Sequence, residues 1–213
     1  LDGQADETVL TASFSHLMET PGGKIDRYKL LYKIGEGGMG IDYLAQQLEP
    51  VKRNVARNVI KPGMDTKRGI ARLKAEQQTL AMMEHPHIAS VYDAVLAPSG
   101  RPYFVMEYVK GIPITEHCDR QKLTIEERLG IFLQVCDAIH HAHQKGIVHR
   151  DIKPSNILVS AENGSALPKV IDFGIAKALT QPLTEQTLFT TDGQLIGTPE
   201  YMSPEQAGLS GID

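Results

Sequence analysis

The chain has 213 residues with 22 Lys and Arg against 26 Asp and Glu, which gives a formal net charge of −4. This mildly acidic balance gives no support for general nucleic-acid binding. No apolar run approaches the ~20 residues that a transmembrane helix needs, and the polar N-terminus lacks the features of a secretory signal. The two cysteines form neither a disulfide framework nor a metal-binding pattern, so we expect a protein of the reducing cytoplasm.

The N-terminal part predicts a leader followed by strands. Residues 1–27 are polar, and we expect them to be disordered. Apolar runs predict strands over residues 28–34, 41–45 and 54–60, and Gly35-Glu36-Gly37-Gly38-Met39-Gly40 joins the first two. A dinucleotide-binding glycine motif would lead into a helix, which these glycines do not. Taken alone, the stretch fits a plain hairpin turn and a loop over nucleotide phosphates equally well.

The middle of the chain predicts two helices with two strands between them. Residues 68–84 have helical apolar spacing, and Pro86 ends that helix. Strands are predicted over 91–97 and 103–106. For His85 and His87 we favour helix termination and packing over metal binding.

A second, longer helix begins at the capping box of Thr124 and Glu127 and ends at Gly146. His140 and His143 lie one turn apart on it without an evident third metal ligand, so we interpret them as structural. Five residues are expected to form its buried face: Leu129, Phe132, Leu133, Cys136 and Ile139.

The chemistry-bearing residues gather after this helix, in His149-Arg150-Asp151-Ile152-Lys153-Pro154-Ser155-Asn156 and in Asp172-Phe173-Gly174. Each segment borders an apolar run that predicts a short strand. Asn156 and Asp172 offer the hard oxygen ligands that Mg²⁺ prefers. Asp151 can orient a hydroxyl group, and Lys153 can neutralise charge on a phosphoryl group in transit.

These two segments resemble the catalytic loop and the metal-binding motif of protein kinases. The lysine two residues after Asp151 is typical of serine/threonine kinases, and the sequence around the motifs is similar to that of bacterial members. The resemblance implies an α+β, two-lobed fold, with a small antiparallel sheet and one helix above a mainly helical lobe. It implies ATP as the phosphoryl donor, Mg²⁺ held by Asn156 and Asp172, and a protein serine or threonine as the acceptor.

The resemblance also implies boundaries and a nucleotide site. The upper lobe would span residues 28–106, the hinge 107–111 and the lower lobe 112–213. Met106 would be the gatekeeper beside the hinge, and Glu76 would come from the helix over 68–84. The implied ATP-binding residues are Ile34, Gly35, Gly37, Gly38, Gly40, Asp42, Ala56, Asn58, Glu76, Met106, Glu107, Val109 and Leu158.

Two of these positions depart from the kinase pattern. Asn58 stands where the phosphate-pairing lysine is expected, and Asp42 stands where a valine packs on adenine. Arg57 and Lys61 are at odd offsets from Asn58, which puts them on the opposite strand face. A catalytically impaired kinase or a binding module is therefore the alternative to an active enzyme.

Residues 179–195 are rich in Thr and Gln and resemble a kinase activation segment. The candidate phosphorylation sites are Thr184, Thr187, Thr190 and Thr191. Ser203-Pro204-Glu205 resembles the family's Ala-Pro-Glu motif. Because kinase domains continue beyond that motif, we expect this chain to be a fragment whose lower lobe exposes apolar surface.

Overall fold

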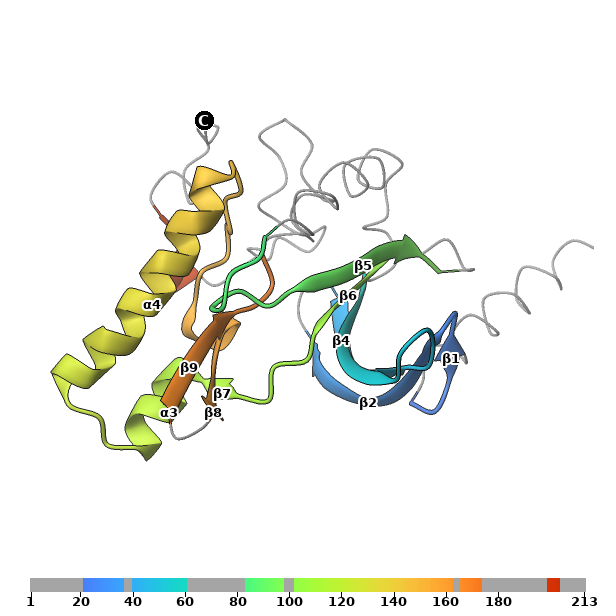
Figure 1. The fold of residues 1–213 in the computed structure, drawn as a ribbon, viewed down its shortest axis with the longest axis horizontal. Helices are drawn as coiled ribbons and strands as arrows, with labels where there is room; N and C mark the ends of the chain where they lie inside the picture. The colour runs from blue at the N-terminus through green and yellow to red at the C-terminus, as the bar shows by residue number, and fades with distance from the viewer. Residues whose placement is uncertain are drawn as a thin grey trace, which may run out of the picture.

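A computed structural model describes residues 21–36, 40–60, 83–97, 102–162, 165–173 and 199–203. Their strands form two sheets, one of six strands in the order β1-β2-β3-β4-β6-β5 and one of three in the order β7-β8-β9 (Figure 1). The six-stranded sheet comprises β1 (Lys24–Ile25), β2 (Tyr28–Glu36), β3 (Gly40–Gln47), β4 (Arg53–Ile60), β5 (Val91–Leu96) and β6 (Pro102–Glu107). The rest comprises β7 (Ile112–Pro113), α3 (Ile114–Arg120), α4 (Ile125–Gln144), η1 (Pro154–Asn156), β8 (Ile157–Glu162), β9 (Ser165–Val170) and η2 (Pro199–Tyr201).

The six-stranded sheet is antiparallel throughout and confirms the strands expected on both sides of the glycine loop. One of its faces buries an apolar cluster that includes Leu30, Val55 and Val105. Arg57 is fully buried on this face, with its guanidinium 3.7 Å from the centroid of the Tyr103 ring. A cation over an aromatic face is stabilised by the ring quadrupole. Arg57 therefore points away from the face of Asn58, as the strand alternation predicts.

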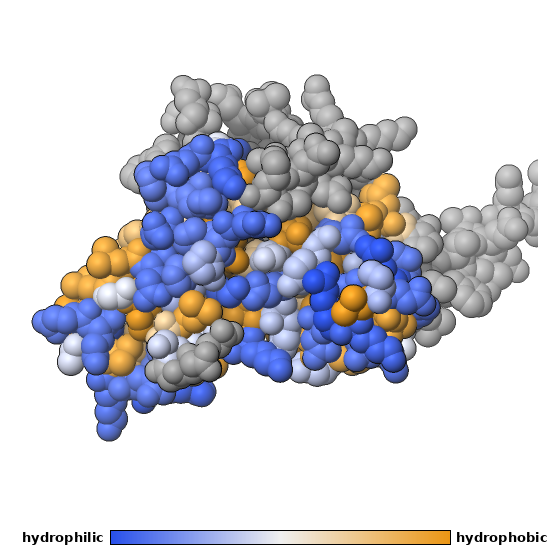
Figure 2. Space-filling model, viewed as in Figure 1, coloured by the Kyte–Doolittle hydropathy of each residue, from blue (hydrophilic) through white to orange (hydrophobic). Residues whose placement is uncertain are grey.

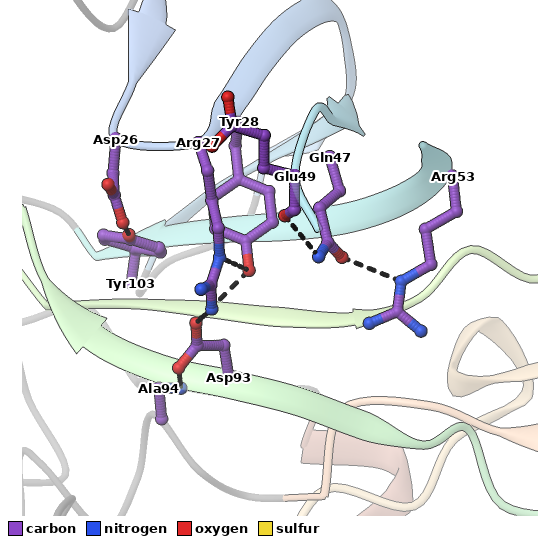
Figure 3. Close-up of polar contacts among 9 residues, drawn as sticks. All are labelled: Asp26, Arg27, Tyr28, Gln47, Glu49, Arg53, Asp93, Ala94 and Tyr103. Carbon is purple, nitrogen blue, oxygen red and sulfur yellow. Dashed lines mark hydrogen bonds and ion pairs between the residues drawn. The ribbon is translucent and has the colours of Figure 1, made fainter. Parts of the chain in front are cut away.

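The expectation of a disordered leader up to residue 27 is wrong for its last part. Lys24–Ile25 forms β1 and pairs with β2, and Ile25 is buried in the sheet's apolar cluster. Figure 3 shows how the following turn is fastened: Arg27 forms an ion pair with Asp93 of β5, and the Tyr28 hydroxyl donates to the same carboxylate at 3.2 Å. A two-residue strand has too little sequence signal to be recognised, and these long-range contacts hold it in place. Residues 1–20 lie outside the described part.

The long helix α4 follows its sequence signals at both ends. Thr124 and Glu127 form the reciprocal capping box, and Gly146 has a φ of +73° that suits a helix stop. Among the described residues, no helix is long and apolar enough to cross a membrane.

The expected buried face of α4 is wrong. The helix packs toward β9 through the smaller side chains Val135, Ala138 and Ala142, and Ile131 is buried with Cys118 and Val159. Leu129, Phe132 and Leu133 are 55%, 52% and 67% exposed, and Cys136 is also exposed. Only Ile139 of the expected set packs at the edge of the core. Small residues let a helix approach a strand closely, so the bulky residues of α4 lie on another face. Figure 2 shows apolar surface along the edge that α4 forms.

This assignment predicts unequal costs for two truncations on α4. Val135→Ala removes buried methyl groups from the core and should lower the free energy of unfolding by about 2 kcal/mol. Leu133→Ala changes an exposed side chain and should cost less than ~0.5 kcal/mol. Urea unfolding of both variants measures the difference, and equal costs would show that the burial of α4 is misassigned.

Candidate active site

The catalytic segment is held by a buried histidine. His149 is 1% exposed, and its ring lies 4.7 Å from that of Phe173. Its Nε2 lies 2.9 Å from the Ile171 carbonyl oxygen, and its Nδ1 lies 3.2 Å from the Asp151 backbone nitrogen. One tautomer satisfies both contacts, with Nε2–H donating and Nδ1 accepting. His149 thus connects the segment of Asp151 to the segment of Asp172.

This connection gives a prediction for His149. Replacing it by Leu leaves a half-buried carbonyl and a half-buried N–H group without their partner, so stability should fall by about 2–3 kcal/mol. The matched change His143→Leu alters an exposed residue of α4 and should be within about 0.5 kcal/mol of the parent. Thermal unfolding of the two variants provides the comparison, and a His149→Leu protein as stable as His143→Leu would contradict the bridging role.

Asn156 is oriented by Asp151. Its Nδ2 donates to the Asp151 carbonyl oxygen at 2.8 Å and to the Asp151 carboxylate at 3.1 Å. Because the amide nitrogen is engaged twice, the side-chain oxygen is the end left for a cation. Lys153 Nζ lies 3.0 Å from the same carboxylate of Asp151. The acid, the amide and the ammonium therefore lie together, as the sequence motif predicts.

Asp172 lies beside this group. The Ile171 N–H donates to the Asn156 carbonyl oxygen at 2.9 Å, and Asp172 has a φ of +56°. The pKa of Asp172 is raised to about 7, mainly by burial and also by the charges of Asp42 and Asp151, against the opposing effect of Lys153. A divalent cation binds the deprotonated carboxylate, so a bound cation would displace the proton from Asp172 and lower this pKa.

The residues present fit a magnesium ion that takes some of its ligands from the protein and the others from a bound substrate. Among the described residues, no group of three or more His, Cys, Asp or Glu side chains is placed to hold a metal by itself. Mg²⁺ usually keeps several waters and binds one or two carboxylates together with substrate phosphates. Asn156 and Asp172 match that pattern.

The two unusual residues of the upper sheet contact each other. Asp42 and Asn58 are directly opposite on β3 and β4, and Asn58 Nδ2 donates to Asp42 Oδ1 at 2.6 Å. Burial raises the pKa of Asp42, and the hydrogen bond from Asn58 partly offsets this. The Asn58 side chain also lies across Gly40, where an added Cβ would come within 2.8 Å of Asn58 Oδ1. Both departures from the kinase pattern are thus one packed pair.

The segment between the two sheets is fixed by an ion pair that sequence reasoning missed. Lys169 Nζ of β9 lies 2.7 Å from Glu107 Oε1, and the Glu107 N–H donates to the Ser90 carbonyl at 2.8 Å. Lys169 interrupts an apolar strand run, which is the only sequence signal for it. The contact ties the end of β6 to the strand that leads to Asp172.

The chain matches the protein kinase domain family over residues 28–211. It belongs to that family. It is 37% identical over 201 residues to the serine/threonine-protein kinase PknB of Mycobacterium tuberculosis, covering 92% of this chain and 31% of the relative. It is 36% identical over 194 residues to Pkn1 of Myxococcus xanthus, covering 90% and 27%. The crystal structure of the M. tuberculosis PknI kinase domain superposes with a TM-score of 0.63 at 29% identity, covering 84% of this chain and 71% of that one.

These comparisons confirm the predicted family, its bacterial serine/threonine type and the two-lobed kinase fold. The chain spans about a third of the length of the curated relatives it matches. Within the kinase domain, Met106 is buried opposite Ala56, and Val109 is buried in the following segment. Ile34 is 42% exposed on β2, and Leu158 pairs with Lys169 across β8 and β9.

Several predicted positions lie outside the described residues. These are Gly37, Gly38, Glu76, Thr184, Thr187, Thr190 and Thr191. The helix predicted over 68–84 falls there too, except for its last two residues, which are not helical in the structure.

Proposed function

We propose that this kinase domain binds ATP with Mg²⁺ and transfers the γ-phosphoryl group to serine or threonine hydroxyls of proteins, at a rate lowered by Asn58 and Asp42. The observation that carries the proposal is the convergence of Asp151, Lys153 and Asn156, with Asp172 beside them. Asp151 would orient the acceptor hydroxyl and accept its proton, and Lys153 would stabilise charge on the transferred group. Bound Mg²⁺ would supply charge neutralisation of the phosphates.

The proposed site draws on both sheets. The glycine positions 35, 37, 38 and 40 would cover the phosphates. The backbone at Glu107 and Val109 would take the adenine edge, with Met106, Ala56, Ile34 and Leu158 around the base. Glu76 would complete the upper wall. The upper lobe would begin at β1, the hinge would span residues 107–111 and the lower lobe would begin at residue 112. The protein would be cytoplasmic.

A phosphorylation-controlled segment is part of the same proposal. Thr184, Thr187, Thr190 and Thr191 are its candidate acceptors, and a phosphate there would pair with Arg150.

The Asp42–Asn58 hydrogen bond favours a second candidate, a nucleotide-responsive binding module with little catalysis. Asn58 brings no positive charge to the phosphates, and Asp42 brings a negative one. Losing one preorganised charge partner typically lowers a rate by about 10²–10³-fold.

Transfer of labelled γ-phosphate from ATP to a general protein substrate separates the two candidates. The parent chain should show slow Mg²⁺-dependent transfer, and Asp151→Asn should lower it by at least about 10²-fold. Asp119→Asn, an exposed carboxylate of α3, serves as the control and should match the parent. Nucleotide binding without transfer in both parent and Asp151→Asn would favour the binding module and overturn the enzymatic proposal.

A further inference from the structure

The Asp42–Asn58 pair changes the charge of the site in which it lies. The kinase pattern has an uncharged valine and a cationic lysine at these positions. Here one positive charge is missing and one negative charge is added, a difference of two units. Because the two side chains hydrogen-bond across adjacent strands at 2.6 Å, they act as one unit.

Among the described side chains, Lys153 offsets this change only in part. Asp42 and Asp172 lie close enough to influence each other electrostatically. The ammonium of Lys153 is 3.0 Å from the Asp151 carboxylate, so its charge is shared with that group. Asp42 is half-buried on β3, so solvent screens its field only in part.

Resting on the proposed nucleotide site, we propose that the Asp42–Asn58 pair makes this site select uncharged adenine nucleosides over ATP. The adenine and ribose would be held mainly by apolar residues and by the backbone near Glu107. Each added phosphate brings negative charge toward Asp42 and Asp172. Affinity should therefore decrease from adenosine to ADP to ATP when no divalent cation is present. Mg²⁺ should reduce the differences in affinity between the three ligands.

Calorimetric titration of the 213-residue chain with adenosine, ADP and ATP tests this, in EDTA and again with Mg²⁺. In EDTA, ATP should bind at least about tenfold more weakly than adenosine. Asp42→Asn is the informative variant because its side-chain oxygen can still accept from Asn58 while the charge is gone. It should raise ATP affinity several-fold relative to adenosine affinity. Asp119→Asn removes a remote exposed carboxylate and should leave the whole series as in the parent.

Two results are decisive against the proposal, and they differ in what else they overturn. If ATP binds the parent as tightly as adenosine in EDTA, or if Asp42→Asn leaves the ratio unchanged, the selectivity is absent while the nucleotide site stands. If neither the parent nor Asp42→Asn binds any of the three ligands, although both unfold cooperatively on heating, the nucleotide site itself is absent and the proposed function fails with it.

Discussion

The double variant Asp42→Val/Asn58→Lys is expected to transfer phosphate about 10²–10³-fold faster than the parent chain. It restores a cation at the position expected to contact the phosphates, and it removes the carboxylate that lies opposite residue 58 on β3. The measurement is the initial rate of γ-phosphate transfer at saturating Mg²⁺. As a control, adding Asp151→Asn to the double variant should abolish the increase in rate.

The single variants sharpen this prediction because the two residues are in contact. Asn58→Lys alone would place its ammonium beside the Asp42 carboxylate, which would hold it away from the phosphates. Asp42→Val alone would leave the half-buried Asn58 amide without its 2.6 Å acceptor. We therefore expect the double variant to exceed the product of the single effects. Simple multiplication of the two effects would show that the residues act independently, and a parent chain as fast as the double variant would show that neither impairs catalysis.

Asp172→Asn is expected to stabilise the metal-free protein at alkaline pH while removing its response to Mg²⁺. The pKa of Asp172 is raised from 3.8 to about 7, mainly by burial, so the folded state binds a proton more tightly than the unfolded state. Stability is then highest below the unfolded pKa and declines as pH rises from about 4 to about 7. The asparagine stays uncharged, so its advantage should be near zero at pH 4. Above pH 7 it should reach a plateau on the order of 2–4 kcal/mol.

Urea unfolding in EDTA at pH 4 and pH 8 measures this advantage, with Asp119→Asn as an exposed control whose stability difference should not change with pH. Adding Mg²⁺ and ADP at pH 8 should stabilise the parent and leave Asp172→Asn unchanged. An advantage that is equal at both pH values would contradict the raised pKa of the carboxyl group.

The residues that the sequence predicted well are those whose signal is local. The strand after the glycine loop, the capping box of Thr124 and the adjacency of Asp151 to Asn156 follow from alternation, side-chain chemistry and short spacing. The family resemblance supplied the order of the two lobes, which no local pattern contains.

The features that the sequence did not predict depend on contacts between distant segments. Lys24–Ile25 is a strand because Arg27 meets Asp93, 66 positions later. The buried face of α4 is chosen by close approach to β9, and helical periodicity alone favoured its bulkier face. The Asp42–Asn58 hydrogen bond requires the register of β3 on β4, which the sequence of the connecting residues 48–52 does not specify.

Divalent-cation binding in the presence of ADP tests the central claim most directly. Mn²⁺ can be followed by its paramagnetic resonance as a substitute for Mg²⁺ in a site of oxygen ligands. The convergence of Asn156 and Asp172 predicts Mn²⁺ binding that weakens at least about tenfold in Asp172→Asn and is displaced by Mg²⁺. Mn²⁺ binding of equal strength in the parent and in Asp172→Asn would mean that these side chains do not hold the metal.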